Sequence, residues 1–133
     1  MNTKRWSNRI AAAGATLAVL ACSVPTEGFT VTVTQRERFA PPDEYRSWWE
    51  SVEACSALRG DFDLARWYRA AGITSGGEGV QGIWESPHDI TVVRGAVADA
   101  SIVSHEILHN LLQGDIDHRH DAWVRCSLVR VDA

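Results

Sequence analysis

The chain is organised around the stretch Ser104-His105-Glu106-Ile107-Leu108-His109-Asn110-Leu111-Leu112-Gln113-Gly114. Its apolar residues recur with the period of a helix, and Asp99 before it and Gly114 after it are typical of a helix start and a helix stop. We therefore predict a helix over residues 100–113, with Asp99 as its N-cap. His105 and His109 lie one turn apart on such a helix, so both can bind a single cation, for which zinc is the first choice.

Glu106 follows the first histidine, and on a helix it would lie beside the metal ion. A carboxylate in that position can accept a proton from a metal-bound water, so Glu106 is the candidate general base. Apart from the histidines, the only strongly polar residues in the second half of the helix are Glu106, Asn110 and Gln113. We therefore expect the helix to be buried on most sides, where its histidines need polar partners.

A catalytic zinc ion usually has three protein ligands and one water. No glutamate follows Glu106, so the third ligand must come from the other donor residues beyond the helix, which are Asp115, Asp117, His118, His120 and Asp121. Because Gly114 lets the chain turn back under the metal, we predict His118 as the third ligand and keep His120 as the alternate. If His118 is the ligand, His120 is a candidate to stabilise the developing oxyanion by a hydrogen bond.

The N-terminus has the features of a bacterial export signal. Lys4, Arg5 and Arg9 precede the apolar run Ile10–Ala21, which is too short for a comfortable membrane span. The run ends in Val19-Leu20-Ala21-Cys22, which resembles a lipobox, so we predict a signal peptide over residues 1–21 and a lipid on Cys22. The expected location is extracytoplasmic, at the cell envelope, with a lipid anchor as the contact to the membrane; ordinary secretion is the alternative.

Cysteine content and charge are consistent with that compartment. With Cys22 acylated, Cys55 and Cys126 remain as a possible disulfide pair, and two separate buried thiols are the alternative.

Removal of residues 1–21 leaves 10 of the 13 basic residues against all 17 acidic residues, a net charge of −7. An acidic chain without a basic cluster argues against a nucleic-acid partner.

The remaining sequence predicts a small α+β domain over residues 43–133, after a tether over residues 22–42 that contains a possible short strand at 30–34. We expect a helix from Asp43, as its N-cap, to about Leu58. Strands are expected at 64–70, 80–84 and 89–94, and the glycine-rich stretch 72–82 is expected to form a loop or a wide hairpin. His88, between the last two strands, is interpreted as a loop residue rather than a ligand.

The pattern His105-Glu106-x-x-His109 followed by a later histidine resembles the zincin metallopeptidases, and the order of helix, strands and motif helix is similar to their N-terminal half. The resemblance implies that the region 84–93 binds a peptide in extended conformation. The chain differs from the metzincin branch, which has Gly and His where Leu112 and Asp115 stand here, and which has a Met-turn that is missing because Met1 is the only methionine. The predicted fold is therefore a minimal, atypical zincin-like domain.

The resulting hypothesis is a zinc-dependent metallopeptidase that hydrolyses peptide bonds of a peptide or protein substrate at the bacterial cell envelope. In this hypothesis His105, His109 and His118 hold Zn²⁺ and Glu106 is the base. The alternative is an envelope lipoprotein that binds zinc without catalysis or has a purely structural role. The sequence does not indicate an oligomeric state.

Overall fold

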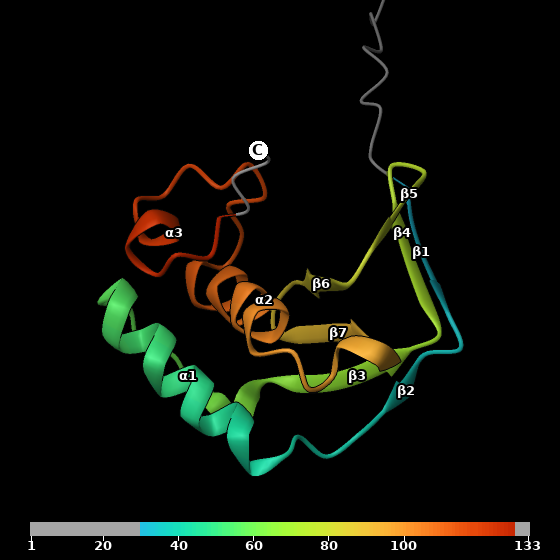
Figure 1. Ribbon diagram of the computed structural model, residues 1–133, viewed down its shortest axis with the longest axis horizontal. Coiled ribbons are helices and arrows are strands. Elements are labelled where there is room, and N and C mark those ends of the chain that lie inside the picture. The colour runs from blue at the N-terminus through green and yellow to red at the C-terminus, as the bar shows by residue number, and fades with distance from the viewer. Residues whose placement is uncertain (1–29, 130–133) are drawn as a thin grey trace, which may run out of the picture.

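The computed structural model describes residues 30–129, which form an α+β fold as the sequence predicts (Figure 1). The predicted signal peptide, Cys22 and the first part of the predicted tether lie outside the described residues. The helices are α1 (Asp43–Ser56), α2 (Ala100–Leu112) and the short α3 (Ala122–Arg125), with 3₁₀ turns at Phe62–Leu64 and Arg94–Ala96. The strands are β1 (Val31–Thr34), β2 (Glu37–Arg38), β3 (Arg66–Ala70), β4 (Gly72–Ser75), β5 (Glu78–Val80), β6 (Gly82–Glu85) and β7 (Asp89–Val93).

A four-stranded mixed sheet carries the site, with strand order β2-β3-β7-β6. β3 and β7 are parallel, while β2 and β6 pair antiparallel to their neighbours. β6 is an edge strand of this sheet, and α2 packs against both β6 and β7. Within residues 30–129 the outer edge of β6 pairs with no further strand, and it lies beside the helix that carries the histidine motif.

A second sheet of order β1-β4-β5 extends away from the helices (Figure 1). The glycine-rich stretch forms the hairpin β4–β5, in which Gly76 and Gly77 have φ angles of +60° and +84° that suit glycine. The strand expected at 30–34 is confirmed, because β1 pairs with β4. Since β2 also pairs with β3, residues 31–38 belong to the folded unit, and the predicted tether is too long at its C-terminal end.

The core lies between the four-stranded sheet and the helices α1 and α2, which pack side by side. Aromatic residues dominate it: Tyr45, Trp49, Trp67 and Trp123 are each at most 2% exposed. The hydroxyl of Tyr45 donates a hydrogen bond to the carbonyl of Val97 at 2.6 Å, and burial raises the pKa of Tyr45 to about 12. Three of the tryptophans in the described part of the chain are thus packing residues of the core.

The two long helices begin differently. The N-cap of α2 is confirmed, because the Asp99 carboxylate accepts hydrogen bonds from the backbone N–H groups of Ser101 and Ile102 at 3.0 and 3.2 Å. The predicted N-cap of α1 is wrong: Pro42 precedes the helix without a side-chain cap, and Asp43 is its first residue. In that position the negative charge of Asp43 still interacts favourably with the positive N-terminal end of the helix dipole.

The predicted disulfide between Cys55 and Cys126 is present and joins the end of α1 to the end of α3. It closes a loop with a sequence separation of 71 residues. In the chain-entropy model a loop of that length stabilises the fold by about 4 kcal/mol. The C-terminal segment is therefore tied to the core. Among residues 30–129, no helix is both long and apolar enough to cross a membrane.

Candidate metal centre

Three histidines converge on one point. His105 and His109 come from adjacent turns of α2, and His118 comes from the loop that follows. The Nε2 atom of His118 lies 3.1 Å from Nε2 of His105 and 3.1 Å from Nε2 of His109, and the ligand atoms of all three lie within 4.8 Å of one another. Nitrogen ligands of a tetrahedral zinc ion lie about 3.3 Å apart for bonds of about 2.0–2.1 Å. The three residues are therefore close enough to bind one metal ion.

Backbone carbonyls fix the protonation pattern of the two helix histidines. Nδ1 of His105 lies 3.0 Å from the carbonyl oxygen of Leu128, and Nδ1 of His109 lies 2.9 Å from that of Gly114. A carbonyl only accepts hydrogen bonds, so Nδ1 must carry the proton and Nε2 keeps its lone pair. Burial also lowers the pKa of His109, which favours the neutral imidazole. Both rings are thus prepared to ligate through Nε2.

The loop after α2 turns sharply to bring His118 back. Gln113, Gly114, Asp115 and His118 all have positive φ angles, of +53°, +142°, +60° and +53°. The Asp115 carboxylate holds this loop, because it accepts hydrogen bonds from the backbone N–H groups of His120 at 2.9 Å and Arg119 at 3.1 Å, and from Nε1 of Trp123 at 2.7 Å. The bond from His120 is the main cause that lowers the pKa of Asp115.

The other donor residues of the loop are engaged elsewhere. Nδ1 of His120 accepts a hydrogen bond from the backbone N–H of Ala122 at 3.1 Å, and His120 is not part of the three-histidine cluster. Asp115 organises the loop, and the carboxylates of Asp117 and Asp121 pair with Arg119 and Arg125. Among the predicted candidates for the third position, the structure therefore brings His118 to the histidine pair.

Trp123 forms the floor of the three-histidine cluster, a role that the sequence does not predict. Its side chain is fully buried, and its ring centroid lies 4.8, 4.6 and 4.4 Å from those of His105, His109 and His118. Its Nε1 bond to Asp115 ties the floor to the loop that carries His118. The sequence carries only a weak signal for this role, an aromatic residue five positions after His118 in a chain rich in tryptophan.

Glu106 lies on the side of α2 that faces β6 and is only 6% exposed. Gly82 of β6 makes room for it: a Cβ atom at Gly82 would lie 2.8 Å from Oε1 and 2.9 Å from Cγ of Glu106. Burial raises the pKa of Glu106 to about 8, and a hydrogen bond with the backbone of Trp84 opposes this shift. A cation held by the adjacent histidines would favour the ionised form of Glu106.

The other polar residues of α2 anchor the β6–β7 hairpin. The side-chain oxygen of Asn110, which is 3% exposed, accepts a hydrogen bond from Trp84 Nε1 at 3.2 Å and lies 3.1 Å from Nδ1 of His88. Gln113 Nε2 donates to the carbonyl of Pro87 at 2.9 Å. His88 thus lies in the loop between β6 and β7, as predicted, and outside the metal cluster. These contacts hold the edge strand in a defined position beside Glu106.

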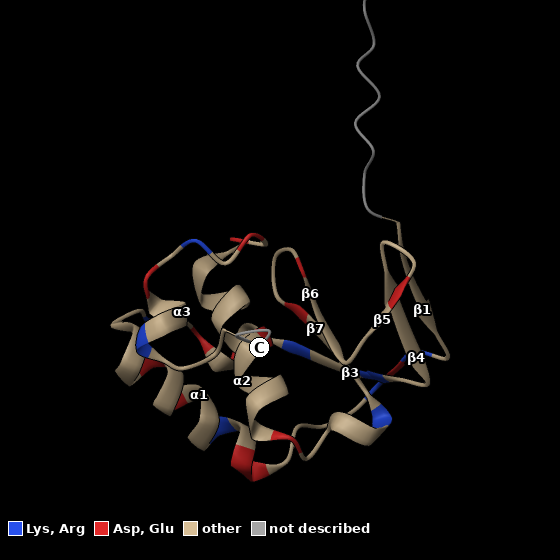
Figure 2. Ribbon diagram, turned by 45° about the horizontal axis from the view of Figure 1, so that its top comes forward, with Lys and Arg blue, Asp and Glu red and all other residues tan. Residues whose placement is uncertain are grey.

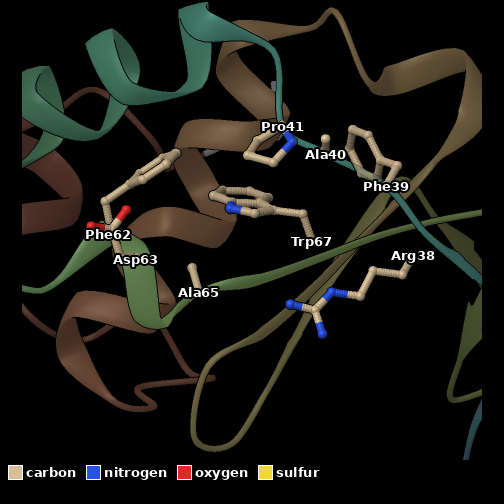
Figure 3. A pocket seen from close by; sticks show the side chains of 8 residues that line it. All are labelled: Arg38, Phe39, Ala40, Pro41, Phe62, Asp63, Ala65 and Trp67. Carbon is tan, nitrogen blue, oxygen red and sulfur yellow. The ribbon is translucent and has the colours of Figure 1, made fainter.

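A cleft of about 360 Å³ opens beside His105 and Glu106, between the β5–β6 segment, the first half of α2 and residues 127–129. A larger cavity of about 430 Å³ lies between the segment before α1, the first 3₁₀ turn and β3 (Figure 3). Its charged lining residues are Arg38 and Asp63, and Asp63 already pairs with Arg46 at 3.0 Å. The larger cavity contains none of the histidines, so the smaller cleft is the candidate site.

Arginines and acidic residues alternate over α1, the four-stranded sheet and the loop before α3 (Figure 2). Many of them pair, as Arg69 does with Glu37 at 2.6 Å and Arg36 with Glu85 at 3.2 Å.

Comparisons with protein-family models, with curated proteins and with solved structures found no match. The function is therefore inferred from the geometry of this chain itself.

Proposed function

We propose that the protein is a zinc-dependent metallopeptidase of the zincin type. The observation that carries the proposal is the convergence of three imidazole Nε2 atoms beside a buried carboxylate. In His105 and His109 a carbonyl accepts the proton of Nδ1, so the lone pair of each ring is on Nε2. The cluster is therefore suited to a cation rather than to a set of mutual hydrogen bonds. A donor set of three neutral nitrogens fits zinc, which commonly retains a fourth position for water in catalytic sites.

The residues divide the work between binding and proton transfer. His105, His109 and His118 would hold the zinc ion, which when bound polarises a carbonyl and lowers the pKa of its water. Glu106 accepts the proton of the attacking water on its carboxylate and passes it to the nitrogen of the leaving amine. The backbone of β6 keeps Glu106 in place for both steps, since Gly82 leaves space for the side chain and Trp84 bonds to it.

The free edge of β6 supports an extended peptide as the substrate. The backbone N–H of Val93 donates to the carbonyl of Gln81, and the alternation of an antiparallel ladder then directs the N–H and C=O groups of Gly82 and Trp84 away from β7. The backbone N–H of Trp84 already bonds to Glu106, which leaves the groups of Gly82 and the carbonyl of Trp84 for a substrate strand. A substrate strand can add to such an edge by main-chain hydrogen bonds. Its scissile bond would then lie close to Glu106, which contacts both residues.

The variant Glu106→Gln tests the proposal, because it removes the base and keeps the shape of the side chain. With purified full-length protein, we expect one zinc per chain by elemental analysis in both proteins. Cleavage of an unfolded protein substrate should fall by roughly 10²–10⁴-fold in the variant, the usual contribution of a general base. Glu50→Gln is the matched control: Glu50 is an exposed residue of α1 outside β6 and outside the cleft, and its loss should leave cleavage unchanged.

Two outcomes would support a different function. Equal cleavage by wild type and Glu106→Gln, with zinc bound to both, would leave a zinc-binding protein without catalysis by this site. Metal far below one equivalent per chain, after purification without chelators, would favour a purely structural role.

We also propose that the protein acts at the cell envelope as a lipoprotein. The support is the lipobox-like sequence before Cys22 and the Cys55–Cys126 disulfide, which suits an oxidising compartment. Cys22→Ser should move the protein from the membrane fraction to the soluble fraction. A variant that still sediments with membranes would argue against the lipid anchor.

A further inference from the structure

The cavity of about 430 Å³ before α1 is separate from the candidate metal centre. It lies between the segment 38–41, the first 3₁₀ turn and β3 (Figure 3). Its lining includes neither Glu106 nor any histidine. The volume is within the roughly 300–1,000 Å³ of small-ligand sites. The cavity is therefore a candidate for a second binding site on the protein.

Three aromatic residues line the cavity. Trp67 on β3 is 2% exposed, while Phe39 and Phe62 are partly buried and pack against the core. The ring centroids of Phe62 and Trp67 are 5.9 Å apart, and the backbone N–H of Phe39 donates to the carbonyl of Trp67 at 3.1 Å. The other uncharged lining residues are Ala40, Pro41 and Ala65. These side chains suit contact with a flat apolar group.

Arg38 is the charged group at the cavity that has no ionic partner in the described part of the chain. Each of the other arginines within residues 30–129 lies at most 3.9 Å from a carboxylate oxygen. The guanidinium of Arg38 is 5.9 Å from the centroid of the Tyr68 ring, at the outer limit of a cation–π contact. Asp63, the acidic residue of the lining, pairs with Arg46 instead, at 3.0 Å. The positive charge beside the cavity is therefore available to a ligand.

The indole nitrogen of Trp67 is a second donor without a partner. Its Nε1 atom is buried and has no hydrogen-bond acceptor among the described residues. Figure 3 shows this nitrogen on the edge of the ring that faces Ala65 and the guanidinium of Arg38. Nε1 of Trp49 also lacks an acceptor, but Trp49 does not line the cavity. A buried donor without an acceptor costs free energy, and an acceptor inside the cavity would remove that cost.

We propose that this cavity binds a carboxylate that is attached to an apolar group of about the size of one ring. The guanidinium of Arg38 pairs with the carboxylate, and the aromatic residues contact the apolar group. Nε1 of Trp67 is covered in the structure, so it donates to the carboxylate when the lining side chains move apart, an adjustment that is common on binding. A singly charged group fits better than a phosphate dianion, because the carboxylate of Asp63 belongs to the same lining. The inference does not depend on the proposed peptidase function.

Titration of the full-length protein with 3-phenylpropionate tests the proposal, and 3-phenylpropanamide is the neutral probe of the same shape. The readout is the NMR signal of the indole N–H groups, assigned with Trp67→Phe and Trp123→Phe. We expect the acid to shift the Trp67 signal and to bind about three- to tenfold more tightly than the amide, as exposed ion pairs and charge-assisted hydrogen bonds allow. The Trp123 signal is the internal control, because Trp123 contacts the histidines and would report a carboxylate at the metal centre instead.

Arg38→Gln isolates the effect of the charge. Arg38 is an exposed residue of the edge strand β2, so the variant should fold, lose the preference for the acid and keep the weaker binding of the amide. Arg59→Gln is the matched control: its side chain is 82% exposed and outside the cavity, and the variant should bind both probes as the wild type does. Ala40→Leu narrows the cavity from an exposed position and should weaken the binding of both probes.

The carboxylate can come from a free organic acid or from the C-terminal end of a peptide, and a third probe separates these sources. N-acetylglycylphenylalanine should bind more tightly than 3-phenylpropionate if the ligand is a peptide end, and less tightly if it is a free acid; either order supports the site. Three results would overturn it: no binding of any probe, equal binding of acid and amide, or equal behaviour of Arg38→Gln and Arg59→Gln. A shift of the Trp123 signal without one of Trp67 would do the same. None of these results bears on the Glu106→Gln test of the metal centre.

Discussion

At the scale of single residues, contacts with the backbone hold the side chains of the site in place. His105 and His109 each bond a carbonyl through Nδ1 and direct Nε2 to the centre. Glu106 packs against β6 at Gly82, where the strand has no side chain. Each of these functional groups is therefore held by backbone atoms, which restricts its orientation before any ligand binds.

The glycine opposite Glu106 provides a prediction. In Gly82→Ala the new Cβ would lie 2.8 Å from Oε1, so the carboxylate must move away from its present position. We expect zinc content to stay the same and kcat to fall by about tenfold or more, because misplacement of a catalytic group by about 1 Å is costly. Gly95→Ala is the control, since a Cβ there meets no atom within 4 Å. Unchanged kcat in Gly82→Ala would show that the fit of Glu106 against β6 is unimportant.

Trp123 provides a second prediction at this scale. Trp123→Phe keeps an aromatic floor but removes the Nε1 donor to Asp115, so the loop that carries His118 loses one of its ties. Loss of such an outer partner typically lowers metal affinity by about 10–100-fold. The measurement is zinc competition against a chromophoric chelator, with Trp48→Phe on α1 as the control. Equal zinc affinity in Trp123→Phe and wild type would mean that the remaining bonds hold the loop alone.

At the scale of elements, α2 has a separate task on each side. Its apolar residues Val103, Ile107 and Leu108 are fully buried in the core, and its histidines face the loop and α3. Glu106, Asn110 and Gln113 face β6 and the β6–β7 loop. Glu106 and Asn110 are thus buried against the hairpin, while Gln113, at the C-cap of the helix, is exposed and bonds to the loop of the hairpin.

The hairpin anchor can be removed selectively. Asn110→Ala leaves Trp84 Nε1 and His88 Nδ1 without their shared acceptor. Loss of a buried hydrogen-bond partner costs about 1–3 kcal/mol, so the midpoint of urea unfolding should fall. Amide hydrogen exchange in β6 should also accelerate relative to β3. Gln113→Ala, which removes a more exposed contact to Pro87, should have a smaller effect, and the reverse order would contradict this account of the anchor.

At the scale of the whole molecule, the disulfide joins the core to the segment that contacts the candidate metal centre. Cys126 lies two residues before Leu128, whose carbonyl orients His105, and its partner Cys55 lies at the end of α1. The C-terminal segment therefore serves the core and the cluster together. It also forms one wall of the cleft.

Removal of the disulfide tests that link. Cys55→Ser with Cys126→Ser should lower the free energy of unfolding by about 2–5 kcal/mol, as is usual for small secreted domains. Because the Leu128 carbonyl loses its fixed position, zinc affinity should fall as well when measured well below the melting temperature. Thermal unfolding measures the stability of the double variant, and a separate zinc titration of the folded double variant measures its zinc affinity. A destabilised variant with unaltered zinc affinity would show that the disulfide acts on stability alone.

The sequence by itself determined the parts of the site that depend on local geometry. His105, Glu106 and His109 are arranged by the period of one helix, and Asp99 caps that helix with its own side chain. The disulfide pair followed from the count of cysteines and the expectation of an oxidising compartment, and the α+β class followed from the succession of helical and strand patterns. Each of these inferences needs only neighbouring residues or a count.

The tertiary structure alone decided which residues complete the site. The choice of His118 depends on a run of positive φ angles and on the bonds of Asp115, and the same bonds leave Asp115 and His120 outside the cluster. Trp123 reaches the histidines, and Gly82 reaches Glu106, only because separate segments pack together. The pairing of β1 and β2 with later strands likewise extended the domain beyond its predicted start. Contacts between residues far apart in the chain follow from the packing of the whole fold, which no local period encodes.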